Sequence, residues 1–308
     1  MRAVVVEQWG GPETLVEREI ERPEPGLNEV LVRVHAAGVN PVDWKVRGSG
    51  ALIEWGEVPV LGWDVSGTVE AVGPGVTVFR PGDEVYGMPL FPRQAGGYAE
   101  YVVAPARQLA AKPASLTHVE AAALPLAALT AWQALVDAAD VRPGERVLVH
   151  AAAGGVGHFA VQIAKARGAY VIGTASAGKH ELVRGLGADE VVDYRSVRFE
   201  EVVSDVDVVL DGLGGETAQR SLAVLRPGGR LITLPGPDDV PAVTPEGVRA
   251  EWVLVEPDQV GLREIAAMVE RGELRPVVDA VLPLAEAAKA HELGERGRTT
   301  GKIVLTVA

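Results

Sequence analysis

A glycine-rich stretch in the middle of the chain is the segment best suited to chemistry. It reads Ala151-Ala152-Ala153-Gly154-Gly155-Val156-Gly157 and joins an apolar run to a helix-like run. Where side chains are small or missing, backbone amides can approach a pyrophosphate, and the next helix points its positive end at it. The sequence therefore predicts a dinucleotide site at Ala153, Gly154, Gly155, Val156 and Gly157, although Ala152 replaces the usual first glycine. The alternative is plain packing of a strand on a helix.

The segment after the next apolar run bears on the choice of cofactor. An acidic side chain there would bind a ribose 2′-hydroxyl and repel a 2′-phosphate. Residues 171–179 contain no acid, whereas Ser176 can donate a hydrogen bond and Lys179 carries a positive charge. This pattern favours NADPH over NADH. The alternative is that Lys179 is a solvated helix residue.

The elements that must position these residues belong to two regions with different sequence patterns. Up to about residue 120, apolar and polar residues alternate over short runs such as 30–36 and 67–72, which predicts small antiparallel strands. From about Ala121, alanine-rich helix and spaced apolar runs predict a parallel α/β sheet. Its expected strands are Arg146 to His150, Tyr170 to Thr174, Glu190 to Asp193, Val206 to Leu210, Arg230 to Leu234 and Trp252 to Val255.

At 308 residues the chain is long enough for two domains. We predict an α/β protein with a mainly β domain over 1–124 and 263–308 and a doubly wound parallel domain over 125–262. Residues 301–307 form the expected strand that returns to the first domain.

Composition excludes several classes of function. The net charge of −13 and the pI of about 5.0 disfavour nucleic acid. The uncharged stretch 121–136 is short for a membrane span, and the N-terminal segment lacks the features of a signal peptide, so we expect a cytoplasmic protein. Cysteine is absent, and the six histidines show no metal-ligand spacing, so no metal site is expected.

Several segments, taken in order, resemble the quinone oxidoreductases of the medium-chain dehydrogenase/reductase superfamily. Besides the glycine-rich turn, they are 38–43, 62–69, 81–87, 129–132, 211–215 and 301–305. The resemblance implies a GroES-like domain joined to a Rossmann domain, with the active cleft between them. In zinc-dependent relatives a cysteine matches Asn40 and a histidine matches Trp63, so the resemblance implies a zinc-independent enzyme.

The same resemblance suggests further cofactor-binding residues. Tyr194 is similar to a tyrosine beside the adenosine phosphate, with Lys179 as its basic companion. Thr130 is similar to a residue near the nicotinamide, and Leu234 and Gly236 belong to a loop that resembles the nicotinamide-contacting loop. For each residue the alternative is an ordinary turn or packing role.

Hydride transfer to a quinone needs an oriented acceptor and a donor for the charge that develops on oxygen. Asn40 is the candidate donor, and its alternative role is to brace a turn. Trp44, Trp63 and Tyr86 offer flat apolar surfaces for a planar ring, and a core role is equally open for each. Asp43 and Asp64 are expected to be structural.

Two other functions stay open at this point. An enone or enoyl reductase acting on a 2-alkenal would use the same hydride step, and a nucleotide-binding redox sensor would use the fold without catalysis. The apolar segment Trp252 to Val255 is expected to be a sheet edge through which a homodimer forms.

Overall fold

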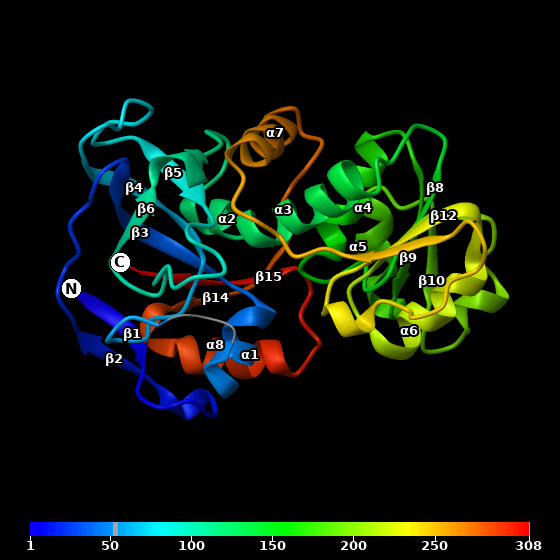
Figure 1. Ribbon diagram of the computed structural model, residues 1–308, viewed down its shortest axis with the longest axis horizontal. Helices are drawn as coiled ribbons and strands as arrows, with labels where there is room; N and C mark the ends of the chain where they lie inside the picture. The colour runs from blue at the N-terminus through cyan, green and yellow to red at the C-terminus, as the bar shows by residue number, and fades with distance from the viewer. Residues whose placement is uncertain (52–54, 308) are drawn as a thin grey trace. The chain divides into compact units, whose positions relative to one another are not determined.

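A computed structural model describes residues 1–51 and 55–307, which form two compact units (Figure 1). The first unit comprises 1–129 and 256–308, and the second comprises 130–255. The division therefore falls after 129 and 255, whereas the sequence placed it after 124 and 262. Contacts explain the shift, because the Leu126 amide donates to Asp64 and the Leu262 carbonyl accepts from the Tyr86 hydroxyl.

The first unit is built mainly on antiparallel strands, as predicted, and β14 and β15 are its parallel pair among the described residues. Its seven-stranded sheet has the order β14-β15-β3-β4-β5-β7, with β6 paired to β3, and β1 and β2 form a separate ribbon. β15 pairs antiparallel with β3, which confirms the predicted returning strand. The strands are β1 (Arg2–Val6), β2 (Leu15–Glu19), β3 (Glu29–Val39), β4 (Asp64–Val72), β5 (Glu84–Gly87), β6 (Tyr101–Pro105), β7 (Leu109–Ala111), β14 (Val278–Pro283) and β15 (Lys302–Thr306).

Helix α1 (Pro41–Ser49) starts immediately after the long strand β3. Its start is fixed by Asp43, whose carboxylate accepts from the Asn40 backbone N–H at 2.6 Å, and by proline at the first helical position. It ends at Gly50, which has a left-handed φ of 66°. The other helices of this unit are α2 (His118–Ala122), α7 (Gln259–Glu270) and α8 (Ala287–Glu295).

The uncharged stretch 121–136 is buried helix, as expected. It contains the end of α2, then α3 (Pro125–Trp132), and it continues as a π-helix over Gln133–Ala138. Within 1–51 and 55–307, no helix combines the length and apolar character that a membrane crossing needs.

The second unit is the predicted doubly wound sheet of six parallel strands. The strand order is β10-β9-β8-β11-β12-β13, and helices α4, α5 and α6 connect successive strands (Figure 1). The elements are β8 (Arg146–Val149), α4 (Gly157–Ala166), β9 (Tyr170–Ala175), α5 (His180–Gly185), β10 (Glu190–Asp193), β11 (Val206–Asp211), α6 (Gly215–Ser221), β12 (Leu225–Thr233) and β13 (Arg249–Trp252).

The last strand departs from its predicted position. β13 ends at Trp252 instead of starting there, because Arg249 to Trp252 pair in register with Arg230 to Thr233 of β12. The prediction of an apolar strand at 252–255 was therefore wrong, and the edge of the sheet carries the ion pair of Arg249 with Glu251 at 3.3 Å.

Candidate functional site

The carboxyl ends of four neighbouring strands bring most predicted cofactor residues to one edge of the second unit's sheet. β9, β8, β11 and β12 are adjacent and parallel, so the segments that follow them share this edge. In an open α/β sheet ligands bind at this edge. The segments are 176–179, 150–157, 212–214 and 234–236.

The glycine-rich turn has the close approaches that a pyrophosphate cradle needs. A Cβ on Gly157 would overlap the carbonyl oxygen of Ala151, and one on Gly173 of the next strand would lie 2.8 Å from the Ala152 Cβ. α4 starts at Gly157, and the N–H groups of His158, Phe159 and Ala160 donate to the carbonyls of Gly154 and Val156, so the N-terminus of the helix closes onto the turn. The turn therefore fits a dinucleotide, with Ala153, Gly154, Gly155 and Val156 between β8 and α4.

The next strand ends where a ribose phosphate would lie in a doubly wound sheet. Ser176 follows β9, and the short turn after it carries Lys179, whose backbone N–H donates to the Ser176 carbonyl at 2.8 Å. Tyr194 follows the neighbouring strand β10 and is 55% exposed, with the Arg195 guanidinium 5.7 Å from its ring centre. Pairing of β9 with β10 brings Ser176 and Tyr194 to adjacent strand ends.

The loops after β11 and β12 form the other part of this edge. Asp211 is buried and accepts from the backbone N–H groups of Leu213 and Gly214, both at 3.0 Å. The Leu234 N–H donates to the Asp211 carbonyl, and Gly236 continues the same loop in an extended conformation. Thr130 lies apart from this edge in sequence, as a buried residue of α3. Their contacts with a cofactor stay predictions.

In the first unit, Asn40 belongs to a buried group of charged and amide side chains. Its Nδ2 donates to Asp64 Oδ2 at 2.8 Å, and its Oδ1 accepts a hydrogen bond from the Lys302 ammonium. Lys302 also donates to Asp64 at 3.1 Å, with side-chain exposures of 3% and 0%. Because Lys302 has only donors, it fixes which end of the Asn40 amide carries oxygen. Among the residues that the structure describes, one of the two amide N–H bonds has an acceptor, and the other can serve a further one.

Asp43 holds the backbone of the same residue from the other side. One of its oxygens accepts from the Asn40 N–H, while Oδ1 has no hydrogen-bond partner in the described part of the chain. Burial, helped by the negative charge of Asp64, raises the pKa of Asp43 to about 7. The two aspartates that the sequence could not bring together thus lie on either side of Asn40.

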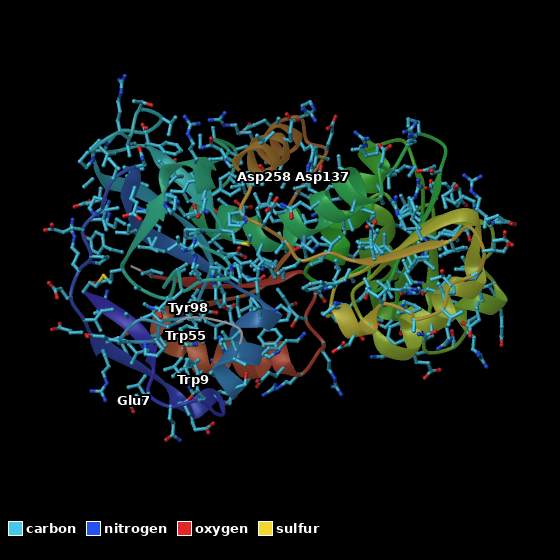
Figure 2. All side chains as sticks on the ribbon, in the orientation of Figure 1. Glu7, Trp9, Trp55, Tyr98, Asp137 and Asp258 are labelled. Atoms are coloured by element: carbon cyan, nitrogen blue, oxygen red, sulfur yellow. The ribbon has the colours of Figure 1, made fainter. Side chains whose placement is uncertain are left out.

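A directed chain of side chains continues from Asp43. Tyr98, which Figure 2 labels, lies close enough to Asp43 for the two groups to affect each other's pKa, and its hydroxyl lies 3.2 Å from His291 Nε2. Arg47 donates to His291 Nδ1 at 3.0 Å and to Glu295 at 2.6 Å. Since Arg47 can only donate, His291 carries its proton on Nε2 and donates to Tyr98. Burial and the nearby Arg47 charge lower the pKa of His291 to about 3.

The three predicted substrate-binding aromatics have different surroundings. Trp63 is 1% exposed, donates its indole N–H to the Arg93 carbonyl at 2.7 Å, and packs edge-on against Phe91. Tyr86 is 0% exposed, and its hydroxyl donates to Leu262. Both rings are therefore buried in the first unit, and their contact with a substrate stays a prediction. Trp44 is half-buried against α8 and stays a prediction.

Sequence reasoning missed Lys302, Tyr98, Arg47 and His291. The signal for Lys302 was present, since a lysine beside the apolar run 303–305 of a central strand needs a buried partner. The other three had no comparable signal, because their partners are up to 248 positions away.

Two family profiles match the chain. The alcohol dehydrogenase GroES-like domain matches residues 26–114, and the zinc-binding dehydrogenase profile matches residues 186–305. Among curated proteins, the chain is 38% identical to the mitochondrial NAD(P)H oxidoreductase RTN4IP1 of Danio rerio, over 91% of this chain and 84% of the relative. It is 35% identical to the quinone oxidoreductase of Homo sapiens, over 99% and 97%. It is also 35% identical to 2-methylene-furan-3-one reductase of Solanum lycopersicum, over 99% and 79%.

Solved structures agree with these matches. The quinone oxidoreductase of Coxiella burnetii superposes with a TM-score of 0.89 at 34% identity, over 100% of this chain and 99% of that one. A mycobacterial protein complexed with NADPH superposes with a TM-score of 0.88 at 34% identity, over 100% of both chains. Fold and site thus define a two-domain oxidoreductase of the medium-chain dehydrogenase/reductase superfamily. Within it, the chain belongs to the quinone oxidoreductase family.

The name of one matching family raises the question of zinc. At the two positions where the resemblance places zinc ligands, the amide of Asn40 is held by Lys302 and Asp64, and the indole nitrogen of Trp63 offers only a donor. A divalent cation beside Asn40 would also face the Lys302 ammonium. These residues do not fit a zinc ion.

Proposed function

We propose that this chain transfers a hydride from NADPH to a quinone without a metal ion. The observation that carries the proposal is the end of β9, which offers Ser176 and Lys179 and no acid, next to a turn shaped for a pyrophosphate. The NADPH bound to the mycobacterial neighbour and the names of the oxidoreductase relatives support the same cofactor. NADPH, when bound, supplies the hydride.

The residues of the first unit would serve the acceptor. When a quinone receives hydride, negative charge develops on its oxygen, and a prepositioned N–H donor stabilises that charge. The second amide N–H of Asn40 has no acceptor within 1–51 and 55–307, and Lys302 polarises the amide from its oxygen end. Asp64 fixes the direction of the amide, so its orientation costs nothing at the moment of reaction. We retain Trp44 as a flat surface for the ring.

The second candidate is reduction of an enone, a step in which the charge develops on a carbonyl oxygen in the same way. The name of the Solanum relative, a 2-methylene-furan-3-one reductase, favours keeping it. A benzoquinone, a naphthoquinone and a 2-alkenal, each mixed with enzyme and NADPH, separate the two candidates by kcat/KM. If NADPH binds and no acceptor is reduced, both fail and a nucleotide-binding sensor takes their place.

The role of Asn40 has its own test. Replacing Asn40 by alanine should lower kcat about 100-fold, the effect of losing one oxyanion donor, with little change in the Kd of NADPH. Equal losses of kcat and of NADPH affinity would assign Asn40 to the fold instead.

We further propose a homodimer and a cytoplasmic location. β13 is the edge strand of the second unit's sheet, so its outer N–H and C=O groups can pair with those of a second copy. A monomeric mass by light scattering at micromolar concentration would contradict the dimer. Imaging of a tagged chain tests the location, for which the mitochondrial relative is the counterexample.

A further inference from the structure

A histidine without a predicted role lies directly before the glycine-rich turn. His150 follows β8, is 3% exposed, and stands between two hydroxyl side chains. Its Nδ1 lies 3.2 Å from Thr174 Oγ1 at the end of β9, and its Nε2 lies 3.0 Å from Ser221 Oγ at the end of α6.

The hydrogen bond that Ser221 makes to the backbone determines the direction of the other hydrogen bonds. Ser221 donates its hydroxyl hydrogen to the Thr217 carbonyl at 2.7 Å, so it can only accept from His150. His150 therefore carries its proton on Nε2, and Nδ1 accepts the hydroxyl hydrogen of Thr174.

Thr174 also accepts hydrogen bonds from the backbone of the glycine-rich turn. The Ala151 N–H donates to Thr174 Oγ1 at 3.2 Å, and the next amide, Ala152 N–H, donates to the Thr174 carbonyl at 2.9 Å. Two consecutive amides at the start of the turn are thus held by one residue, whose hydroxyl is oriented by His150. Burial lowers the pKa of His150 to about 4, so the neutral ring that this arrangement needs is present at neutral pH.

Ala151 is the residue that needs such support. Its φ of 49° lies in the left-handed region, which is unfavourable for alanine. In this conformation its carbonyl accepts from Gly154 N–H at 2.8 Å, which closes the turn. The same carbonyl leaves no room for a side chain at Gly157, the first residue of α4.

We propose that His150 and Thr174 are positioning residues for the cofactor: through Ala151 they hold the turn 151–157 in the conformation that receives a pyrophosphate before NADPH arrives. The proposal rests on the proposed use of NADPH. A turn that is already ordered loses less conformational entropy when the cofactor binds. It should therefore lower the Kd of NADPH and leave the rate of the chemical step unchanged.

The test compares two substitutions of one residue. Thr174→Val keeps the branched shape and removes the hydroxyl, whereas Thr174→Ser keeps the hydroxyl. We expect the Kd of NADPH, from fluorescence titration, to rise about tenfold in the valine variant, the order of one lost buried hydrogen bond, and to return to within about twofold of wild type in the serine variant. His150→Phe should weaken binding by a similar factor.

The matched control is Thr233→Val. Thr233 ends β12 at the same edge, is 0% exposed, and its hydroxyl has no hydrogen-bond partner in the part of the chain that the structure describes. This change should leave the Kd of NADPH within about twofold of wild type, because no hydrogen bond is lost.

Hydrogen exchange of the free protein gives a readout that does not depend on the cofactor. The amides of 151–157 should exchange faster in Thr174→Val than in wild type or Thr174→Ser. Unchanged exchange, or a lowered melting temperature with an unchanged Kd, overturns the proposal. If wild type itself fails to bind NADPH, the cofactor assignment fails, and the exchange rates alone decide whether the histidine holds the turn.

Discussion

Replacing Lys302 by methionine removes the ammonium from the buried group around Asn40 while keeping most of the side-chain length. Asp64 would keep two partners, the Asn40 amide at 2.8 Å and the Leu126 N–H at 2.6 Å, but it would lose its ion pair with Lys302. Both charged side chains are almost fully buried, so solvent cannot replace the lost charge. Removing one member of a buried pair costs about 3–5 kcal/mol.

This loss of stability can be measured as a decrease in melting temperature. For a domain of this size each kcal/mol corresponds to about 2–4 °C, so Lys302→Met should lower the transition of the first unit by about 6–20 °C. Circular dichroism at pH 7.5 measures the shift. Lys289→Met is the matched control, because the ion pair of Lys289 with Glu286 is 62% and 42% exposed and such pairs contribute about 0–1 kcal/mol.

A second substitution separates charge from packing. The double variant Lys302→Met/Asp64→Asn removes both charges of this ion pair together, so it should be more stable than the two single losses added together predict, by at least about 1 kcal/mol. Two results would refute the reasoning. Either Lys302→Met melts within about 2 °C of wild type, or the single losses simply add.

Three other substitutions test separate parts of the site. The pKa of Asp43 is raised from about 3.9 in the unfolded chain to about 7 in the fold, so wild type loses stability as the pH rises between these values. Asparagine does not titrate, so the free energy of unfolding of Asp43→Asn, measured in urea between pH 4.5 and 8, should rise relative to that of wild type by up to about 4 kcal/mol. Lys179→Ala should weaken NADPH about tenfold and NADH little in paired titrations, and equal weakening would remove Lys179 from the phosphate site. Gly157→Ala should weaken NADPH at least about tenfold by the same titration, because its Cβ would overlap the Ala151 carbonyl, and unchanged affinity would show that the turn can relax.

The positions of the predicted cofactor residues at the strand ends could be predicted because they depend on local sequence. The turn 151–157, Ser176 and Tyr194 each follow a strand directly, and parallel strands bring their carboxyl ends to one edge without any knowledge of side-chain packing. The error at β13 has the same origin. An apolar run marks the vicinity of a strand, but register with β12 decides where the strand ends.

The other half depends on side chains that meet from distant segments. Asn40 contacts Asp64 across 24 positions and Lys302 across 262, and each contact needs the sheet order β15-β3-β4 to exist first. Alternation along a strand predicts which residues are buried, but it does not say which buried polar groups face one another. Trp63 shows a second limit of prediction from sequence. An aromatic residue near a candidate site has the same sequence pattern whether it lines a pocket or fills the core.

The two halves also differ in what holds them. In the second unit, backbone amides would form the proposed site, and neutral groups such as His150 and Thr174 hold the backbone. In the first unit, an amide side chain is the candidate donor, and charges fix its orientation, with the Lys302 ammonium at its oxygen and the Asp64 carboxylate at its nitrogen. The neutral hydrogen bonds that hold the turn do not change with pH above the low pKa of His150, whereas the charged group around Asn40 responds to every neighbouring group that titrates.

Asp43, with its pKa of about 7 and its hydrogen bond to the Asn40 backbone, is a neighbouring group that titrates. The pH dependence of hydride transfer near neutrality should therefore originate in the first unit, and Asp43→Asn should flatten the profile of kcat while leaving the profile of NADPH affinity unchanged. A kcat profile that keeps its shape in this variant would contradict that division.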